Sequence, residues 1–123
     1  MGRLLKVGDL AELDYCYVTT TGRRSGAPHT VEIWFALHEG VVYLLSGGGD
    51  VSDWVKNLRE HSAVGLRLGE RDMICRARLV DEPAEDELAR RLLFEKYAPR
   101  YSGDLVEWSR TALPVAIDLP DEG

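Results

Sequence analysis

Residues 19–35 read TTTGRRSGAPHTVEIWF, and the interpretation of the whole chain starts from them. Threonines precede a short polar segment and a run rich in β-branched and aromatic residues follows it, which predicts two strands joined by a turn. The turn has a glycine at each end and basic or hydroxyl side chains between them: Gly22, Arg23, Arg24, Ser25 and Gly26. A local group of cations on a chain of net charge −6 predicts a site for phosphate or carboxylate; an ordinary solvated hairpin tip is the alternative.

The composition limits the classes of function. With 21 acidic against 15 basic residues, the chain does not have the basic surface that general nucleic-acid binding needs. Its 123 residues, 45% of them hydrophobic, are expected to form one domain, 1–123. Cys16 and Cys75 lie in apolar runs without metal-binding spacing, so we expect buried free thiols and neither a metal site nor a disulfide. No signal peptide or membrane-spanning run stands out, which predicts a soluble cytoplasmic protein without membrane contact.

The pattern along the chain predicts a mainly β, α+β architecture with about six mostly antiparallel strands and a few helices. Strands are expected at 15–20, 30–37, 41–46, 63–68, 73–80 and 114–119, and a helix at 83–97. The first three strands are expected to lie consecutively in the sheet. Arginines at 67, 76 and 78 alternate with apolar residues, which predicts a sheet face that is solvated or part of an interface. Residues 1–12 are expected to form an N-terminal arm or a helical turn, whose apolar side chains are able to pack on another surface such as a partner subunit.

A glycine-rich loop follows the third expected strand. Residues 46–50 read SGGGD, and the apolar residues after them recur at helical spacing: Val51, Trp54, Val55 and Leu58. Asp50 or Ser52 is expected to cap this helix. Bare amides at a helix start can hold an anion or bond the edge of a planar ring, whereas a flexible linker is the alternative. We expect Gly48 to have a positive φ and to leave the space that a ring edge needs.

Three blocks of the sequence resemble the deazaflavin-dependent nitroreductase family of the FMN-binding split-barrel superfamily. These blocks are TTTGRRSGAPHTVEIWF, LLSGGGDVSDWVKNLREHSAVGLRLG and WSRTALPVAIDL, and the likeness extends from about Tyr15 to Leu119. The resemblance implies a split β-barrel, usually dimeric, that binds reduced coenzyme F-420 in a groove formed by the first two blocks. It also implies hydride transfer to a small organic acceptor such as an enone, a quinone or a nitroaromatic compound.

The resemblance also assigns roles to residues. The tail of the coenzyme, with its phosphate and carboxylates, would meet Arg23, Arg24, Ser25 and Gly26, with His29 where the family usually has arginine. The edge of the deazaflavin ring would lie against Ser46, Gly47, Gly48 and Gly49, with Gly47 in place of a lysine common in the nitroreductases. Trp54 and Asn57 would hold the helix that follows. Tyr101 lies near the position of a substrate-side tyrosine and is the one candidate catalytic residue.

Two other functions remain open at this point: an oxidoreductase that binds FMN or another flavin, and a non-catalytic binding protein for a small anionic or tetrapyrrole ligand. In an F-420-dependent reductase or a flavin oxidoreductase the cofactor supplies the reactivity. The absence of a catalytic triad from the sequence is therefore expected for both. A chain of this size is too small to enclose a large coenzyme alone, which favours a homodimer.

Overall fold

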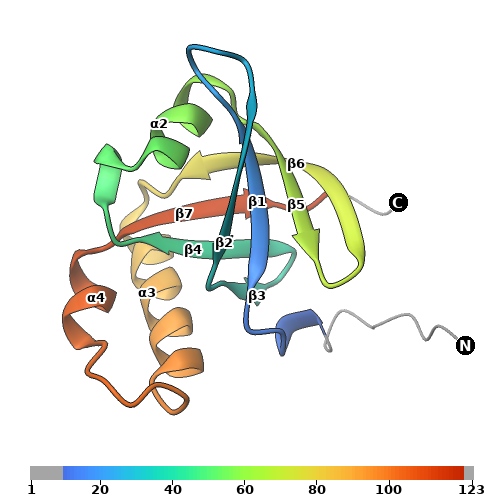
Figure 1. Cartoon of the computed structure of the whole chain (residues 1–123). Helices are drawn as coiled ribbons and strands as arrows, with labels where there is room; N and C mark the ends of the chain where they lie inside the picture. Colours follow the sequence, from blue (N-terminus) through green and yellow to red (C-terminus); the bar gives the residue numbers. More distant parts are fainter. Residues whose placement is uncertain (1–9, 121–123) are drawn as a thin grey trace, which may run out of the picture.

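A computed structural model describes residues 10–120, where seven strands, three α-helices and one 3-10 helix form the fold (Figure 1). The strands are β1 (Cys16–Thr21), β2 (Pro28–Ile33), β3 (Ala36–His38), β4 (Val41–Ser46), β5 (Ala63–Leu68), β6 (Arg71–Leu79) and β7 (Leu113–Asp118). The helices are η1 (Gly49–Val51), α2 (Asp53–Glu60), α3 (Pro83–Tyr97) and α4 (Val106–Thr111). Of the predicted N-terminal arm, residues 1–9 lie outside the described residues, and Leu10 is buried in the core.

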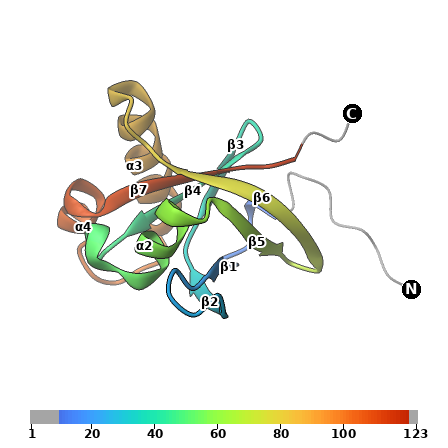
Figure 2. The ribbon, with the colours of Figure 1, turned by 90° about the horizontal axis from the view of Figure 1, so that it is seen from above.

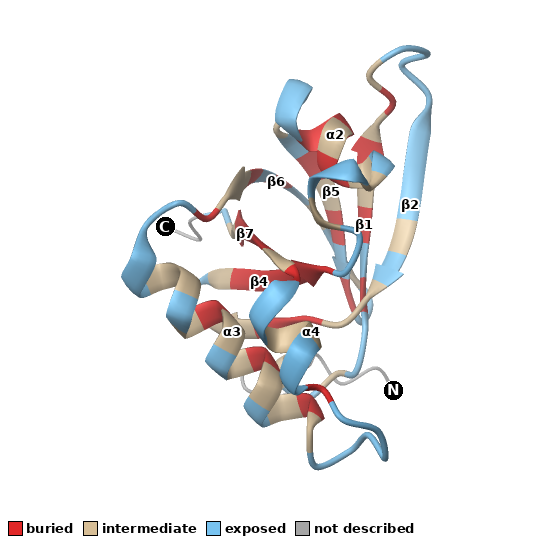
Figure 3. Ribbon diagram, turned by 90° about the vertical axis from the view of Figure 1, so that its left-hand side faces the viewer, coloured by how far each residue is buried: buried red, intermediate tan, exposed pale blue. Residues whose placement is uncertain are grey.

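All seven strands belong to one sheet in the order β2-β1-β5-β6-β7-β4-β3. Every neighbouring pair is antiparallel, and the sheet forms a half-barrel. This confirms the predicted split-barrel architecture. The edge strand β2 is mostly exposed, whereas β4 is buried along nearly its whole length (Figure 3).

The single strand predicted for residues 30–37 is wrong, because the chain bends at Trp34 and Phe35. β2 ends before this bend and β3 begins after it, and the two strands lie at opposite edges of the sheet. The predicted order of three consecutive strands is therefore wrong too. The backbone of Phe35 bonds to α3 instead of to a neighbouring strand: its N–H donates to the Tyr97 hydroxyl at 3.0 Å, and its carbonyl accepts from Lys96 Nζ at 2.9 Å.

Side chains pack on both faces of the sheet. On the inner face, alternate residues such as Val18, Leu44 and Ile117 form a core with α2. On the outer face, Tyr43 and Leu45 pack with α3 and α4. Helix α3 packs mainly on the β3, β4 and β7 part of the sheet and, among residues 10–120, lies away from β1 and β5 (Figure 2).

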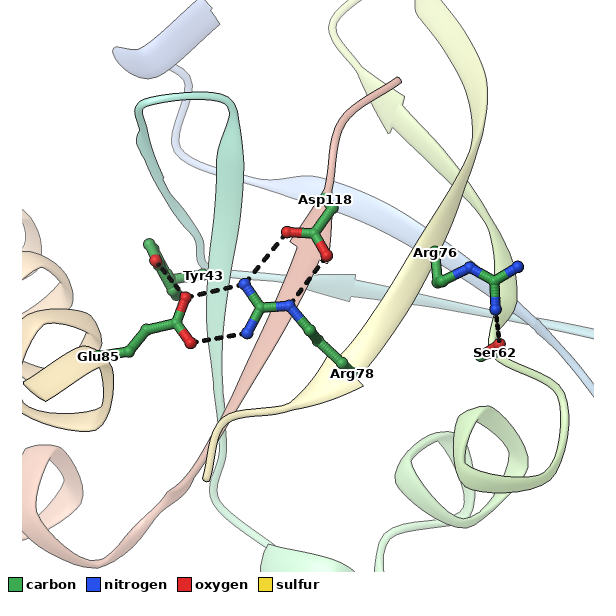
Figure 4. A network of polar contacts seen from close by, with 6 residues as sticks. All are labelled: Tyr43, Ser62, Arg76, Arg78, Glu85 and Asp118. Atoms are coloured by element: carbon green, nitrogen blue, oxygen red, sulfur yellow. Dashed lines mark hydrogen bonds and ion pairs between the residues drawn. The ribbon is translucent and has the colours of Figure 1, made fainter. Parts of the chain in front are cut away.

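Helix α3 is fixed to the sheet by an ion-pair network (Figure 4). Arg78 on β6 donates to both oxygens of Glu85, at 2.6 and 2.8 Å, and to both oxygens of Asp118 on β7, at 2.9 and 3.1 Å. The Tyr43 hydroxyl donates to Glu85 at 2.8 Å. Mainly through its bonds with Arg78, the pKa of Glu85 is lowered from 4.5 to about 2. Arg67 and Arg76 are exposed on one face of the sheet, as predicted, whereas Arg78 on the same face has this structural role.

This network predicts an acid-sensitive contribution to stability. Because the pKa of Glu85 is lowered in the folded state, its contribution is complete above the ordinary value of 4.5 and is lost as the pH falls toward about 2. The Glu85→Gln variant should therefore be less stable than the wild type at pH 7, and the difference should shrink below pH 4. Urea unfolding across this range measures it, with the exposed Glu87→Gln on the same helix as the control. A difference that does not change with pH would contradict the assignment.

Candidate functional site

The basic turn between β1 and β2 is a tight, internally bonded loop. The Gly22 N–H donates to the carbonyl of Ala27 at 2.7 Å, and the Gly26 N–H donates to the carbonyl of Gly22 at 2.8 Å. Gly26 has a φ of 75°, and a Cβ on Gly22 would lie 2.9 Å from Ser25 Oγ. The positive φ of Gly26 therefore favours glycine, whereas at Gly22 a side chain would crowd Ser25 and the carbonyl of Ala27.

The side-chain amide of Asn57 on α2 holds this turn in place. Its Oδ1 accepts from the backbone N–H of Arg23 at 3.2 Å and from Arg23 Nη1 at 2.8 Å. Its Nδ2 donates to Thr20 Oγ1 at 3.2 Å, and Asn57 itself is only 2% exposed. Arg23 Nη2 also lies 3.3 Å from Asp53 Oδ1. Arg23 is thus held in one orientation, with its charge partly offset by a carboxylate.

The turn and α2 together form an open pocket of about 200 Å³, which we call the basic pocket. It is lined by Gly22, Arg23, Arg24, Ser25, His29, Asp53 and Asn57. Within residues 10–120 the exposed Arg24 side chain makes no hydrogen bond or ion pair, in contrast to Arg23. Ser25 Oγ accepts from the Ala27 N–H at 3.1 Å and can still donate to a ligand. The pocket is therefore able to hold an anion.

The glycine loop leads through η1 into α2 (Figure 1), the helix whose Asp53 and Asn57 line the basic pocket. Ser46 is 2% exposed, and its Oγ donates to the carbonyl of Gly49 at 3.0 Å and lies 3.1 Å from Ser52 Oγ. Ser52 occupies the predicted N-cap position of α2, but its hydroxyl meets Ser46 and makes no capping bond to a helix amide. Ser46 therefore positions the loop, and Gly47 and Gly48 form its exposed part.

The prediction of a positive φ at Gly48 is wrong. Gly48 has a φ of −82°, and the positive φ, 61°, belongs to Gly49. A Cβ on Gly48 would lie 2.2 Å from Ser52 Oγ, so this glycine is needed for the loop itself. A Cβ on Gly47 would meet nothing within 4 Å. The loop thus leaves open space beside Gly47, and also beside Gly49, where the positive φ itself favours glycine.

The helix after the loop is shorter than the apolar spacing predicted. Val51 belongs to η1 and is 68% exposed, so its predicted place on the buried face is wrong. Val55 and Leu58 are buried in the inner core, and Trp54 packs against that core from its edge. Trp54 supports the helix in this way.

Tyr101 lies apart from the basic pocket. It is 50% exposed in the loop between α3 and α4, and this loop is at the opposite end of the molecule from the basic turn (Figure 1). Its ring meets Trp34 edge-on at 5.6 Å. Trp34 also stacks on Tyr97 at 4.3 Å and meets Trp108 edge-on at 5.5 Å. The structure therefore groups Tyr101 with an aromatic cluster at the bend between β2 and β3.

Residues 3–120 match the family of F420H(2)-dependent quinone reductases. The chain belongs to this family. The protein is thus an F-420-dependent oxidoreductase, and of the cofactors considered from the sequence, F-420 is the one supported. No curated protein sequence matches the chain.

Several solved structures share the fold of this chain. An F-420-H2-dependent reductase is 22% identical with a TM-score of 0.68, over 85% of this chain and 94% of that one. A conserved hypothetical protein from Mycobacterium tuberculosis is 18% identical with a TM-score of 0.71, over 98% and 82% of the two chains. A domain-swapped dimer is 20% identical with a TM-score of 0.69, over 85% and 80%. These likenesses support the fold.

Sequence reasoning missed three polar residues of this reductase's candidate site. Asp53 lines the basic pocket, Thr20 accepts from Asn57, and Ser52 bonds to the glycine loop. The role of Asp53 could have been predicted from the sequence, because Asp53 lies four residues before Asn57 and therefore on the same face of the helix. In residues 10–120 no helix is long and apolar enough to cross a membrane.

Proposed function

We propose that this F-420-dependent reductase binds the anionic tail of its cofactor in the basic pocket and the deazaflavin ring beside Gly47 and Gly48, and that it reduces a small quinone. One observation carries the proposal: Arg24 is an exposed cation with no partner among the described residues, in a pocket on a protein of charge −6. When bound, reduced F-420 supplies the hydride.

The residues of the pocket fit the chemistry of such a tail. Phosphate and carboxylate oxygens are good acceptors for guanidinium and hydroxyl groups, which Arg24 and Ser25 present. Arg23 contributes its charge from a fixed position, because Asn57 and Asp53 already hold it. A pocket whose shape is set before binding loses less entropy when it takes up a ligand.

The glycine loop fits the planar deazaflavin ring of the cofactor. Gly47 has open space where a side chain would point, and Ser46 holds the loop from its buried side. The role of Tyr101 on the substrate side remains a prediction. We also propose a homodimer, which the dimeric structural neighbour supports.

The proposed reaction is tested by mixing the purified protein with reduced F-420 and following the return of the absorbance of its oxidised form. We expect oxidation that depends on both protein and quinone, and slower oxidation with an enone or a nitroaromatic acceptor. A rate no higher than that of the protein-free mixture with every acceptor would contradict the proposed function.

A bulky side chain at Gly47 should block the ring without disturbing the fold. We expect Gly47→Leu to weaken F-420 binding about 5- to 10-fold, because the new side chain fills space that is open now. Gly47→Ala is the matched control and should bind nearly as wild type. Fluorescence titration measures both, and thermal unfolding checks that they fold alike. Equal affinity of Gly47→Leu and wild type would remove this loop from the site.

A further inference from the structure

An acidic side chain lines the basic pocket. Among the residues of 10–120 that form the pocket, Arg23 and Arg24 are permanent cations, and Asp53, the first residue of α2, is the one carboxylate. Asp53 Oδ1 lies 3.3 Å from Arg23 Nη2, and the Asp53 side chain is 85% exposed, against 22% for Arg23. A pocket that is able to hold an anion therefore contains an anion of its own.

The fold gives little reason for a carboxylate at this place in the pocket. Asn57 already orients Arg23, because its Oδ1 accepts from Nη1 at 2.8 Å and from the backbone N–H at 3.2 Å. An ion pair with a partner as exposed as Asp53 contributes little to stability. A carboxylate in the first turn of α2 does interact favourably with the helix dipole, but this effect needs no contact with Arg23. The contact therefore points to an effect on what the pocket binds.

We propose that Asp53 limits the affinity of the basic pocket for the anionic tail of the cofactor, because it competes with the tail for Arg23. This inference rests on the proposed function. A phosphate or carboxylate oxygen that accepts from Arg23 Nη2 has to displace Asp53. One that binds Arg24 alone remains close to a like charge, which repels it. In both arrangements Asp53 makes binding weaker than the two arginines alone would make it.

A limited affinity suits a pocket for a hydride donor. The hydride is spent in one turnover, so the oxidised cofactor has to be exchanged for a reduced one, and release is the slow step of many enzymes. Asp53 contacts Arg23 and leaves Arg24 and the Ser25 hydroxyl available to the tail. It therefore shortens the residence time of the cofactor without removing the groups that recognise its charge.

Fluorescence titration of the full chain with F-420 tests this role. Asp53→Asn should bind F-420 about 2- to 5-fold more tightly than the wild type at low salt, because an exposed charge contact is lost. The gain should shrink at high salt, which screens the carboxylate. Stopped-flow dilution of the complex should show slower release by a similar factor. Glu60→Gln removes an exposed carboxylate from the same helix outside the pocket and should bind as the wild type does.

Two further measurements separate this role from a structural one. Asp53→Glu keeps the charge and should bind F-420 within about 2-fold of the wild type. Thermal unfolding of Asp53→Asn should show no gain in stability, so that affinity rises while stability does not. If Asp53→Asn binds no more tightly although Arg24→Ala binds more weakly, the role of Asp53 is overturned and the proposed function stands. A wild type that binds no F-420 would overturn both.

Discussion

Replacing Asn57 with leucine should lower the free energy of unfolding by about 3 kcal/mol and weaken F-420 binding as well. Asn57 is buried, and its side-chain amide bonds to Arg23 on the basic turn and to Thr20 on β1. Leucine has nearly the same volume but leaves these polar groups without their partner. Since each unsatisfied buried group costs about 1 to 3 kcal/mol, the loss should be large. Urea unfolding measures the stability, and fluorescence titration measures the binding.

A second substitution at this position separates the two functions of the amide. Asn57→Asp keeps an acceptor for Arg23 but removes the donor to Thr20, so we expect a smaller loss of stability than with leucine. Glu60→Gln, exposed at the end of the same helix, should change neither quantity. An unfolding free energy of Asn57→Leu equal to that of wild type would show that the amide does not hold the turn.

Replacing Arg24 with alanine should weaken F-420 binding about 10- to 100-fold, with little change in stability. A charge-assisted hydrogen bond to a phosphate or carboxylate contributes about 1.5 to 3 kcal/mol, and Arg24 is the cation of the basic pocket that no described residue engages. Arg23→Ala should differ, because it removes bonds to Asn57 and Asp53 and therefore lowers stability together with affinity. Arg59→Ala, an exposed cation on α2 outside the pocket, is the control.

The sequence predicted the local features of this site well. Gly22 and Gly26 bound a tight turn, and Arg23, Arg24 and Ser25 line one pocket with His29 and Asn57. These residues lie in two short segments, where turn chemistry and helical spacing carry most of the information. The prediction of roles for them came from the family resemblance, and the structure adds the contacts.

Features that depend on distant residues were not predictable in this way. The bend at Phe35 depends on Tyr97, which is 62 residues away, so residues 30–37 had the pattern of one uninterrupted strand. The structural role of Gly48 depends on Ser52, and its neighbour Gly49 has the positive φ instead. Ile74 alternates with buried residues as a strand residue should, but its 73% exposure depends on which elements pack on its side of the sheet.

Titration of F-420 into wild type and Arg24→Ala, at low and high salt and beside FMN, tests the central claim most directly. We predict tight binding of F-420 by the wild type at low salt, weaker binding at high salt, and much weaker binding by the variant, because salt screens the charges of an exposed site. FMN, with its single phosphate, should bind less tightly than F-420 to the wild type. If Arg24→Ala binds F-420 as tightly as the wild type does, or if FMN binds more tightly throughout, the basic pocket is not the site of the F-420 tail.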